Sequence, residues 1–171
     1  MEHVILVDEQ DNERGTMEKM EAHQQGVLHR AFSVLLFNSQ GQLMLQKRAR
    51  TKYHSGGLWT NTCCSHPLPG EPVERAVQRK LMQEMGIQYK PEFAFKFIYK
   101  TKLEGGLTEY ELDHVYTGLY DGTPVLNQEE AEGWKLMDLP VLRDDIQRNP
   151  THYTVWFKII MNHPQLSSIQ V

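Results

Sequence analysis

Short apolar runs mark the first third of the chain and predict strands. Val4–Val7 is one such run, and Phe32–Phe37 has the continuous apolar pattern of a buried strand. The turn-forming residues Asn38–Gly41 join the second run to Leu43–Lys47, so a hairpin is expected there. The polar stretch Thr16–Gln24 is expected to be a loop or a short helix.

Apolar residues at helical spacing follow Pro72 and predict a helix over Pro72–Met85. Pro72 suits the first helical position, and Gly86 suits the C-terminal stop. The apolar residues lie three or four apart, at Val73, Ala76, Val77 and Leu81. Two strands are expected at Phe93–Lys102 and Leu112–Tyr120, joined by a turn at 104–106. Two helices, separated at Pro150, are expected at Leu139–Asn149 and Thr151–Asn162.

Strands interrupted by one strong helix and followed by terminal helices indicate an α+β fold, layered α/β/α. A length of 171 residues suits one domain, expected over 1–171, and 40% hydrophobic residues suffice for its core. No apolar run approaches the ~20 residues that a membrane span needs. We therefore expect no membrane partner.

Composition and charge point to a cytoplasmic location. The start, Met1-Glu2-His3, lacks the basic and apolar regions of a secretory signal. The two cysteines are adjacent, which excludes a disulfide framework and fits a reducing compartment. The formal charge of −4 argues against non-specific nucleic-acid binding. One basic cluster contrasts with this net negative charge: Lys47, Arg48, Arg50 and Lys52. The cluster is either an anion-binding site or a solvated strand end.

The segment Leu58–Pro67 concentrates side chains that can transfer protons or bind a metal. It brings a thiol, Cys64, within two residues of an imidazole, His66, and Pro67 stiffens the backbone just beyond. Elsewhere Glu109 and Glu111 are two apart, so on a strand both face the same side. Taken singly, a histidine is more often unliganded than a ligand, and a buried cysteine is usually an inert small hydrophobe.

The predicted helix carries a degenerate Nudix box. Residues of that pattern are present at Glu71, Arg79, Leu81, Glu84, Gly86 and Ile87, whereas Ser65, Lys80 and Gln83 replace a glycine and two glutamates. Lys80 and Glu84 are four apart and share one helix face. In Nudix hydrolases that face holds several carboxylates for divalent cations on a diphosphate. Alone, the degenerate box fits an amphipathic helix equally well.

Together with this box, the run Trp59–Pro67 resembles the type I isopentenyl diphosphate isomerases, a Nudix-fold family. The resemblance covers nearly the whole chain, from Val4–Asp8 through Gly15–Lys19 to Trp156. It implies a mixed sheet flanked by helices. It also implies reversible allylic proton transfer between isopentenyl and dimethylallyl diphosphate, through a carbocation-like intermediate and without a redox cofactor, in isoprenoid biosynthesis.

The resemblance also implies roles for particular residues. Cys64 and Glu111 would lie on opposite faces of the substrate, with Tyr99 as proton-relay partner, while Cys63 would only pack. The metal centre would hold Mn²⁺, Zn²⁺ or Mg²⁺ on nitrogen and oxygen donors, supplied by His23, His29, His66, Glu109 and Glu111. A second ion, Mg²⁺, would bridge Glu84 to the diphosphate. The substrate would be bound by Lys19, Arg48, Lys52, Lys80 and Trp156, the last through its indole face.

Two other classes of function are weighed against the isomerase. A Nudix hydrolase of nucleoside or prenyl diphosphates should carry a full acidic box, and Lys80 and Gln83 count against it. A non-catalytic binding or scaffold domain should have lost Cys64, Glu111 or the histidine set, and all are present. The expected partner is a small prenyl diphosphate, bound by a monomer or weak dimer. The remaining histidines are expected to be unliganded: His3, His54, His114, His152 and His163.

Overall fold

A computed structural model describes residues 1–167 of the chain. Residues 168–171, which complete the predicted domain, lie outside the described part. The strands are β1 (His3–Val7), β2 (Glu13–Glu18), β3 (His29–Phe37), β4 (Leu43–Arg48), β5 (Trp59–Thr60), β6 (Cys63–Ser65), β7 (Glu92–Lys102), β8 (Thr108–Leu119) and β9 (Ala131–Met137). The α-helices are α1 (Lys19–Gln25), α2 (Val73–Met85), α3 (Leu139–Arg148) and α4 (Val155–Met161), and short 3₁₀ turns lie at Glu104–Gly106 and Pro150–His152.

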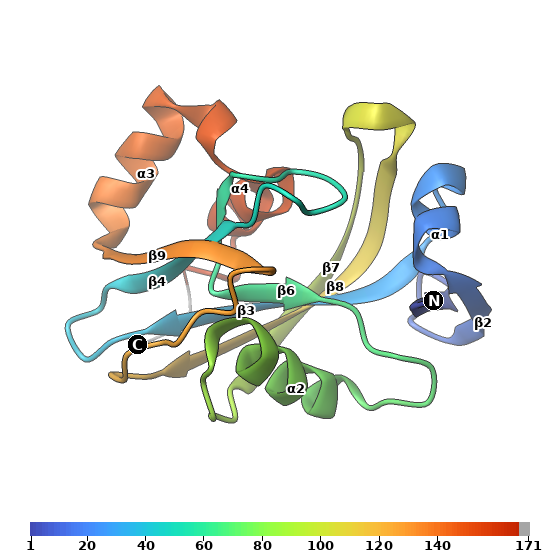
Figure 1. Ribbon diagram of the computed structural model, residues 1–171, viewed down its shortest axis with the longest axis horizontal. Helices are drawn as coiled ribbons and strands as arrows, with labels where there is room; N and C mark the ends of the chain where they lie inside the picture. Colours follow the sequence, from blue (N-terminus) through green and yellow to red (C-terminus); the bar gives the residue numbers. More distant parts are fainter. Residues whose placement is uncertain (168–171) are drawn as a thin grey trace.

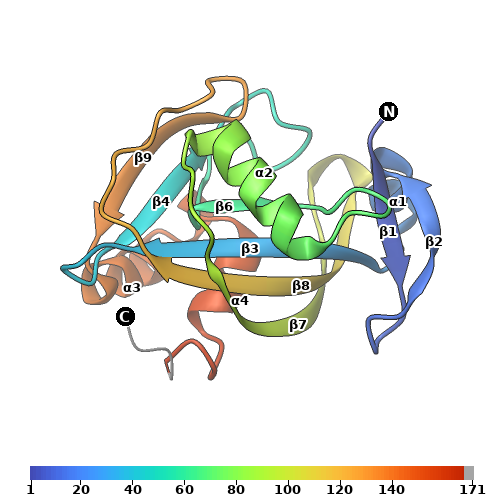
Figure 2. The same cartoon turned by 90° about the horizontal axis from the view of Figure 1, so that it is seen from below.

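The strands form a mixed sheet with helices on both faces, so the α+β, layered α/β/α prediction is confirmed (Figures 1 and 2). β3 runs through its centre, parallel to β8 and antiparallel to β1, β4 and β6. β7 pairs with β8, and β9 pairs with β4. Helix α2 covers one face, whereas α3 and α4 lie on the other (Figure 1). Within residues 1–167, no helix is long and apolar enough to cross a membrane.

Alternate side chains of β3 enter two cores on opposite faces of the sheet. Val34 and Leu36 pack in the core that contains the apolar face of α2, while Leu35 packs with Phe157 of α4. This is why the run reads as continuously apolar in the sequence. Full burial of each such side chain contributes about 1.5–3 kcal/mol.

Helix α2 matches its prediction closely. Pro72 is the N-cap residue rather than the first helical residue, with extended backbone angles. Gly86 ends the helix at a φ of 63°. A Cβ at Gly86 would lie 2.6 Å from the Val125 carbonyl oxygen, so both the left-handed angle and the close approach require glycine.

The predicted hairpin of β3 and β4 is only partly correct. The two strands pair at Phe37 and Leu43 and then diverge. β6 takes the place beside β3 instead, with Cys64 opposite Ser33. Strands β5, β6 and β9 were not predicted, because their sequences show no recognisable pattern. The segment Thr16–Gln24, expected to be a loop or a short helix, contains the end of β2 and most of α1. The insertion of β6 next to β3 carries Cys64 and His66 towards the middle of the sheet.

Candidate active site

A cavity of about 270 Å³ opens between the sheet, α1 and the loop from β4 to β5. This size lies at the small end of ligand-binding sites, which suits a small molecule. Segments far apart in the sequence converge on it, from Glu2, just before β1, to Trp156 on α4. Its walls include nine of the predicted site residues: Lys19, Arg48, Lys52, Cys64, His66, Lys80, Glu109, Glu111 and Trp156.

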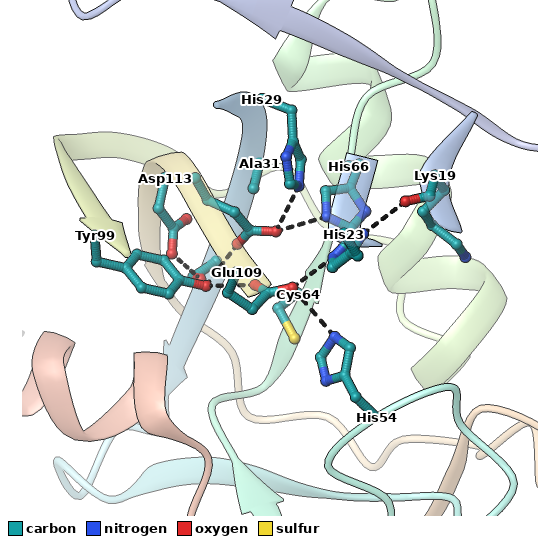
Figure 3. A network of polar contacts seen from close by, with 12 residues as sticks. Lys19, His23, His29, Ala31, His54, Cys64, His66, Tyr99, Glu109 and Asp113 are labelled. Atoms are coloured by element: carbon teal, nitrogen blue, oxygen red, sulfur yellow. Dashed lines mark hydrogen bonds and ion pairs between the residues drawn. The ribbon is translucent and has the colours of Figure 1, made fainter. Parts of the chain in front are cut away.

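Three imidazoles and two carboxylates meet at the base of this cavity (Figure 3). His23 Nε2 lies 2.5 Å from Glu109 Oε1. His29 Nε2 and His66 Nε2 lie 3.1 Å and 2.7 Å from Glu111 Oε2. The parallel register of β3 and β8 places His29 directly beside Glu111. The structure therefore brings together the five residues that the sequence analysis assigned to a metal.

The orientation of the rings fits a metal ion. His23 Nδ1 lies 2.7 Å from the carbonyl oxygen of Lys19, and His29 Nδ1 lies 2.8 Å from that of Val27. A carbonyl oxygen can only accept, so each Nδ1 carries the hydrogen and each Nε2 is free to present a lone pair. An Nε2 that faces a carboxylate oxygen has either a proton or a metal ion between the two atoms. Imidazole nitrogens beside two buried carboxylates are a donor set that suits a divalent ion.

The titration behaviour of the two carboxylates reflects their close contacts with the imidazoles. Burial opposes ionisation of Glu109, but the imidazoles of His23 and His54 outweigh it and hold the pKa of Glu109 well below its usual value. Burial and the charge of Glu109 also oppose ionisation of Glu111, yet His29 and His66 leave its pKa lowered. Both carboxylates are therefore ionised at neutral pH.

Tyr99 bridges the two carboxylates from β7. Its hydroxyl lies 2.7 Å from Glu109 Oε2 and 2.6 Å from Glu111 Oε1, and shares its single hydrogen between them (Figure 3). Burial, together with these two negative charges, raises the pKa of Tyr99 well above 10. Tyr99 thus keeps its proton and holds it against Glu111, as a relay partner must.

Cys64 and Cys63 point to opposite faces of β6, as adjacent strand residues do. Cys64 lines the cavity, with its Sγ 3.9 Å from Arg48 Nη1. Burial raises the pKa of the Cys64 thiol to about 12 even though the Arg48 charge acts against the shift. Cys64 is therefore a protonated thiol at neutral pH. Cys63 is fully buried in the core beneath α2.

The three lysines that line the cavity each contact a carboxylate. Lys19 Nζ lies 3.2 Å from Glu2 Oε2, and Lys80 Nζ lies 3.3 Å from Glu84 Oε2. Lys52 Nζ lies 2.5 Å from a carboxylate oxygen of Glu130. The basic cluster is thus split, because Arg48 and Lys52 line the cavity, whereas Lys47 and Arg50 do not.

The remaining predicted residues lie against the walls. Glu84 is 2% exposed on α2, beside the cavity, and Gln46 Nε2 donates to it at 3.1 Å. Trp156 is 3% exposed on α4, and the guanidinium carbon of Arg48 lies 5.2 Å from its ring centroid. The indole face therefore already receives a cation.

Three groups near the site were missed by the sequence analysis. His54, expected to be unliganded, lies with its Nε2 3.2 Å from Glu109 Oε1. Glu130 lines the cavity, and Asp113 is 1% exposed, accepting a hydrogen bond from Ser33 Oγ at 2.8 Å. Burial raises the pKa of Asp113 well above its usual value. Asp113 follows Glu109 and Glu111 at the same spacing of two, which could have signalled it.

His114 faces away from the site. Its Nε2 lies 2.8 Å from Asp11 Oδ2, and its Nδ1 lies 3.2 Å from the carbonyl oxygen of Ala31. The odd spacing of three from Glu111 along β8 gives this opposite direction.

The sequence matches the NUDIX domain family over residues 27–157. An isopentenyl-diphosphate Delta-isomerase 2 of Aromatoleum aromaticum is 53% identical, over 91% of this chain and 82% of that protein. The isopentenyl-diphosphate Delta-isomerase of Serratia proteamaculans is 50% identical, over 94% of this chain and 89% of its own length.

Solved structures show the same fold at low sequence identity. A Deinococcus radiodurans protein superposes with a TM-score of 0.76 at 20% identity, covering 93% of this chain and 97% of that one. A MutT protein of Methanosarcina mazei gives a TM-score of 0.67 at 15% identity, covering 84% of this chain and 96% of that one. The fold, the site geometry and the curated relatives agree: the chain belongs to the isopentenyl-diphosphate Delta-isomerase family, within the NUDIX domain family.

Proposed function

We propose that this protein interconverts isopentenyl and dimethylallyl diphosphate by protonation and deprotonation, in isoprenoid biosynthesis. One observation carries the proposal. Cys64 and Glu111 reach the same small cavity from different strands, and cationic side chains line the same cavity: Lys19, Arg48, Lys52 and Lys80. A thiol on an apolar double bond serves no purpose in phosphate hydrolysis, whereas two-sided proton transfer needs such a pair.

The cationic side chains that line the cavity would bind the diphosphate. Lys19, Lys52 and Lys80 now face Glu2, Glu130 and Glu84, so an incoming diphosphate would compete with these carboxylates. Arg48 offers a planar fork of donors that suits phosphate oxygens. Glu84, the ion-pair partner of Lys80, would hold Mg²⁺ at the diphosphate. The charge of that ion would offset the acidic side chains around the diphosphate.

The protonation states suggest the direction of each transfer. The protonated Cys64 thiol would give its hydrogen to the terminal CH₂ carbon of isopentenyl diphosphate, which leaves a thiolate and a tertiary cation at the branched carbon. Ionised Glu111 would then take a hydrogen from the adjacent CH₂ group nearer the diphosphate, and the new double bond forms there. Tyr99 would hold the Glu111 carboxylate in place and relay its proton. In the reverse direction the two roles exchange.

His23, His29, His66, Glu109 and Glu111 would hold the second ion. When bound, it would supply a fixed positive charge that tunes the proton affinity of Glu111. Its identity, Mn²⁺, Zn²⁺ or Mg²⁺, stays open because all three accept nitrogen and oxygen donors. Trp156 would stabilise the cationic intermediate with its indole face, since indole is the best aromatic partner for a cation.

Replacement of His23, His29 or His66 by alanine tests this metal centre. Each single variant should bind Mn²⁺ or Zn²⁺ much more weakly, because removing one donor leaves the ion short of ligands in a buried site. Metal content after dialysis, measured by elemental analysis, gives the result. Full occupancy in all three variants would remove the proposed centre.

The hydrolase alternative is separated from the isomerase by one assay. The purified protein, incubated with isopentenyl diphosphate and Mg²⁺, should form dimethylallyl diphosphate with no flavin or nicotinamide added. Free phosphate and pyrophosphate are measured in the same samples. Rapid phosphate or pyrophosphate release without isomer would favour hydrolysis.

For the cellular setting, we propose a cytoplasmic enzyme folded as one domain over 1–171, acting as a monomer or weak dimer. A formal charge of −4 and adjacent free cysteines support this setting. The proposed partner is the prenyl diphosphate, with neither a nucleic acid nor a membrane involved.

A further inference from the structure

We propose that His54 is a further donor at the metal centre, delivered by the loop at 49–58 that also carries Lys52. The inference rests on the metal centre proposed above and adds a residue to it. His54 lies far in sequence from His23 and His29, and on a different segment from His66. A role for His54 as a metal donor therefore rests on its position in the folded structure.

The ring of His54 is buried and aimed at the centre. The residue is 3% exposed, and its Nε2 lies 3.2 Å from Glu109 Oε1 (Figure 3). Yet within residues 1–167 this Nε2 has no partner in hydrogen-bond geometry. A buried nitrogen left without a hydrogen bond is costly unless something else occupies it.

The other ring nitrogen follows the pattern of the proposed ligands. His54 Nδ1 lies 3.0 Å from Ser55 Oγ, as His23 and His29 Nδ1 lie against carbonyl oxygens. The Ser55 hydroxyl can accept from Nδ1, which leaves the lone pair on Nε2, although a hydroxyl can also donate. Three rings thus share one geometry, with Nδ1 contacted by an oxygen and Nε2 directed at the carboxylates.

Donor atoms of His23, His54 and Glu109 lie within 4.8 Å of one another. A second group with the same spacing contains His23, His29, His66 and Glu111. His23 belongs to both groups, so the two groups adjoin, and we assign them to one centre. His54 extends that centre on the side of Glu109.

The loop holds His54 in this position by several contacts. Arg48 Nη2 donates to the His54 carbonyl oxygen at 3.1 Å, and the Ser55 amide donates to Glu104 Oε1 at 2.8 Å. Gly56 leaves no room for a Cβ, which would lie 2.6 Å from the Arg50 carbonyl oxygen. The His54 ring also packs edge-on against Trp156, with centroids 5.7 Å apart. Such anchoring on both sides gives the ring a defined direction.

Metal affinity tests the inference without relying on turnover. His54→Ala should weaken Mn²⁺ binding, titrated by the free-ion electron paramagnetic resonance signal, by at least about 10–100-fold, since loss of even an outer-shell partner commonly costs that much. Ser55→Ala removes only the partner of Nδ1 and should weaken binding less, so it keeps the inference testable if His54→Ala does not fold. His152→Ala, at an exposed position, is the matched control and should bind as the unaltered protein does.

Co²⁺ spectra separate a ligand from a residue that merely positions Glu109. Loss of His54 as a donor should change the d–d bands of the Co²⁺-loaded protein. Unchanged Mn²⁺ affinity in His54→Ala, with His23→Ala and His66→Ala impaired, would overturn the inference and leave the metal centre standing. An affinity loss with unaltered Co²⁺ bands would also overturn it. Unchanged affinity in all of these variants would remove the centre itself.

Discussion

Cys64→Ala is expected to abolish isomerisation while the fold is retained. The thiol holds one of the two protons that the proposed reaction moves, and alanine has nothing to give. General acid–base groups commonly contribute ~10²–10⁴-fold, so the loss should reach the top of that range or exceed it. Cys64 is only partly buried and lines the cavity at the edge of the core, so the fold should tolerate its truncation. The measurement is the rate of dimethylallyl diphosphate formation, with thermal unfolding as a check on folding.

Cys63→Ala is the matched control for that variant. Cys63 is fully buried under α2, and its Sγ faces away from the cavity. Its loss should lower stability by about 1 kcal/mol, typical of a modest core truncation, and leave most of the activity. Equal losses of activity at both cysteines would mean that Cys64 has been given the wrong role.

Glu111→Gln should cost as much activity as Cys64→Ala. Glutamine keeps the shape and one oxygen but cannot take up a proton. Tyr99 Oη contacts Glu111 Oε1, and His29 and His66 contact Oε2, so both carboxylate oxygens of Glu111 have polar partners. The rate should fall ~10⁴-fold or more, with the KM for isopentenyl diphosphate changed much less.

Glu109→Gln is the comparison that separates proton transfer from metal binding. Glu109 contacts His23 and His54 and shares the Tyr99 hydroxyl, but it is not assigned a proton to transfer. Its variant should suffer through weaker metal binding, so excess Mn²⁺ should partly restore it and should not restore Glu111→Gln. Near-full recovery of Glu111→Gln in excess Mn²⁺ would make Glu111 a ligand only, and Tyr99 would be the next candidate proton donor.

The sequence predicted those elements whose stability depends on local signals. Helix α2 has its apolar spacing, Pro72 before it and Gly86 after it, and β3 is apolar on both faces. The short strands β5 and β6 have no such signal, because two or three residues show no period. They are strands only because β4 and β3 supply partners, which is a tertiary effect.

The residues of the candidate site also divide into those that the sequence predicted and those that only the folded structure brings together. Histidines and carboxylates in the family's register were found, and the spacing of Glu109 and Glu111 correctly placed both on one face of β8. His54 was missed because its approach to Glu109 depends on the path of the loop at 49–58, held by Arg48 and Glu104. Glu130 was missed for a similar reason, since its contact with Lys52 joins residues 78 apart. Contacts of this kind leave no periodic trace in a sequence.

The most direct test of the account is the fate of the two protons in D₂O. Isopentenyl diphosphate is incubated with the enzyme and Mg²⁺ in D₂O, and the product is analysed by NMR at low conversion. Because Cys64 and Glu111 both exchange with solvent, the account predicts a deuterium in a methyl group of dimethylallyl diphosphate and loss of one hydrogen from the CH₂ group next to the branched carbon. Dimethylallyl diphosphate formed with no solvent deuterium would contradict proton transfer by two separate residues.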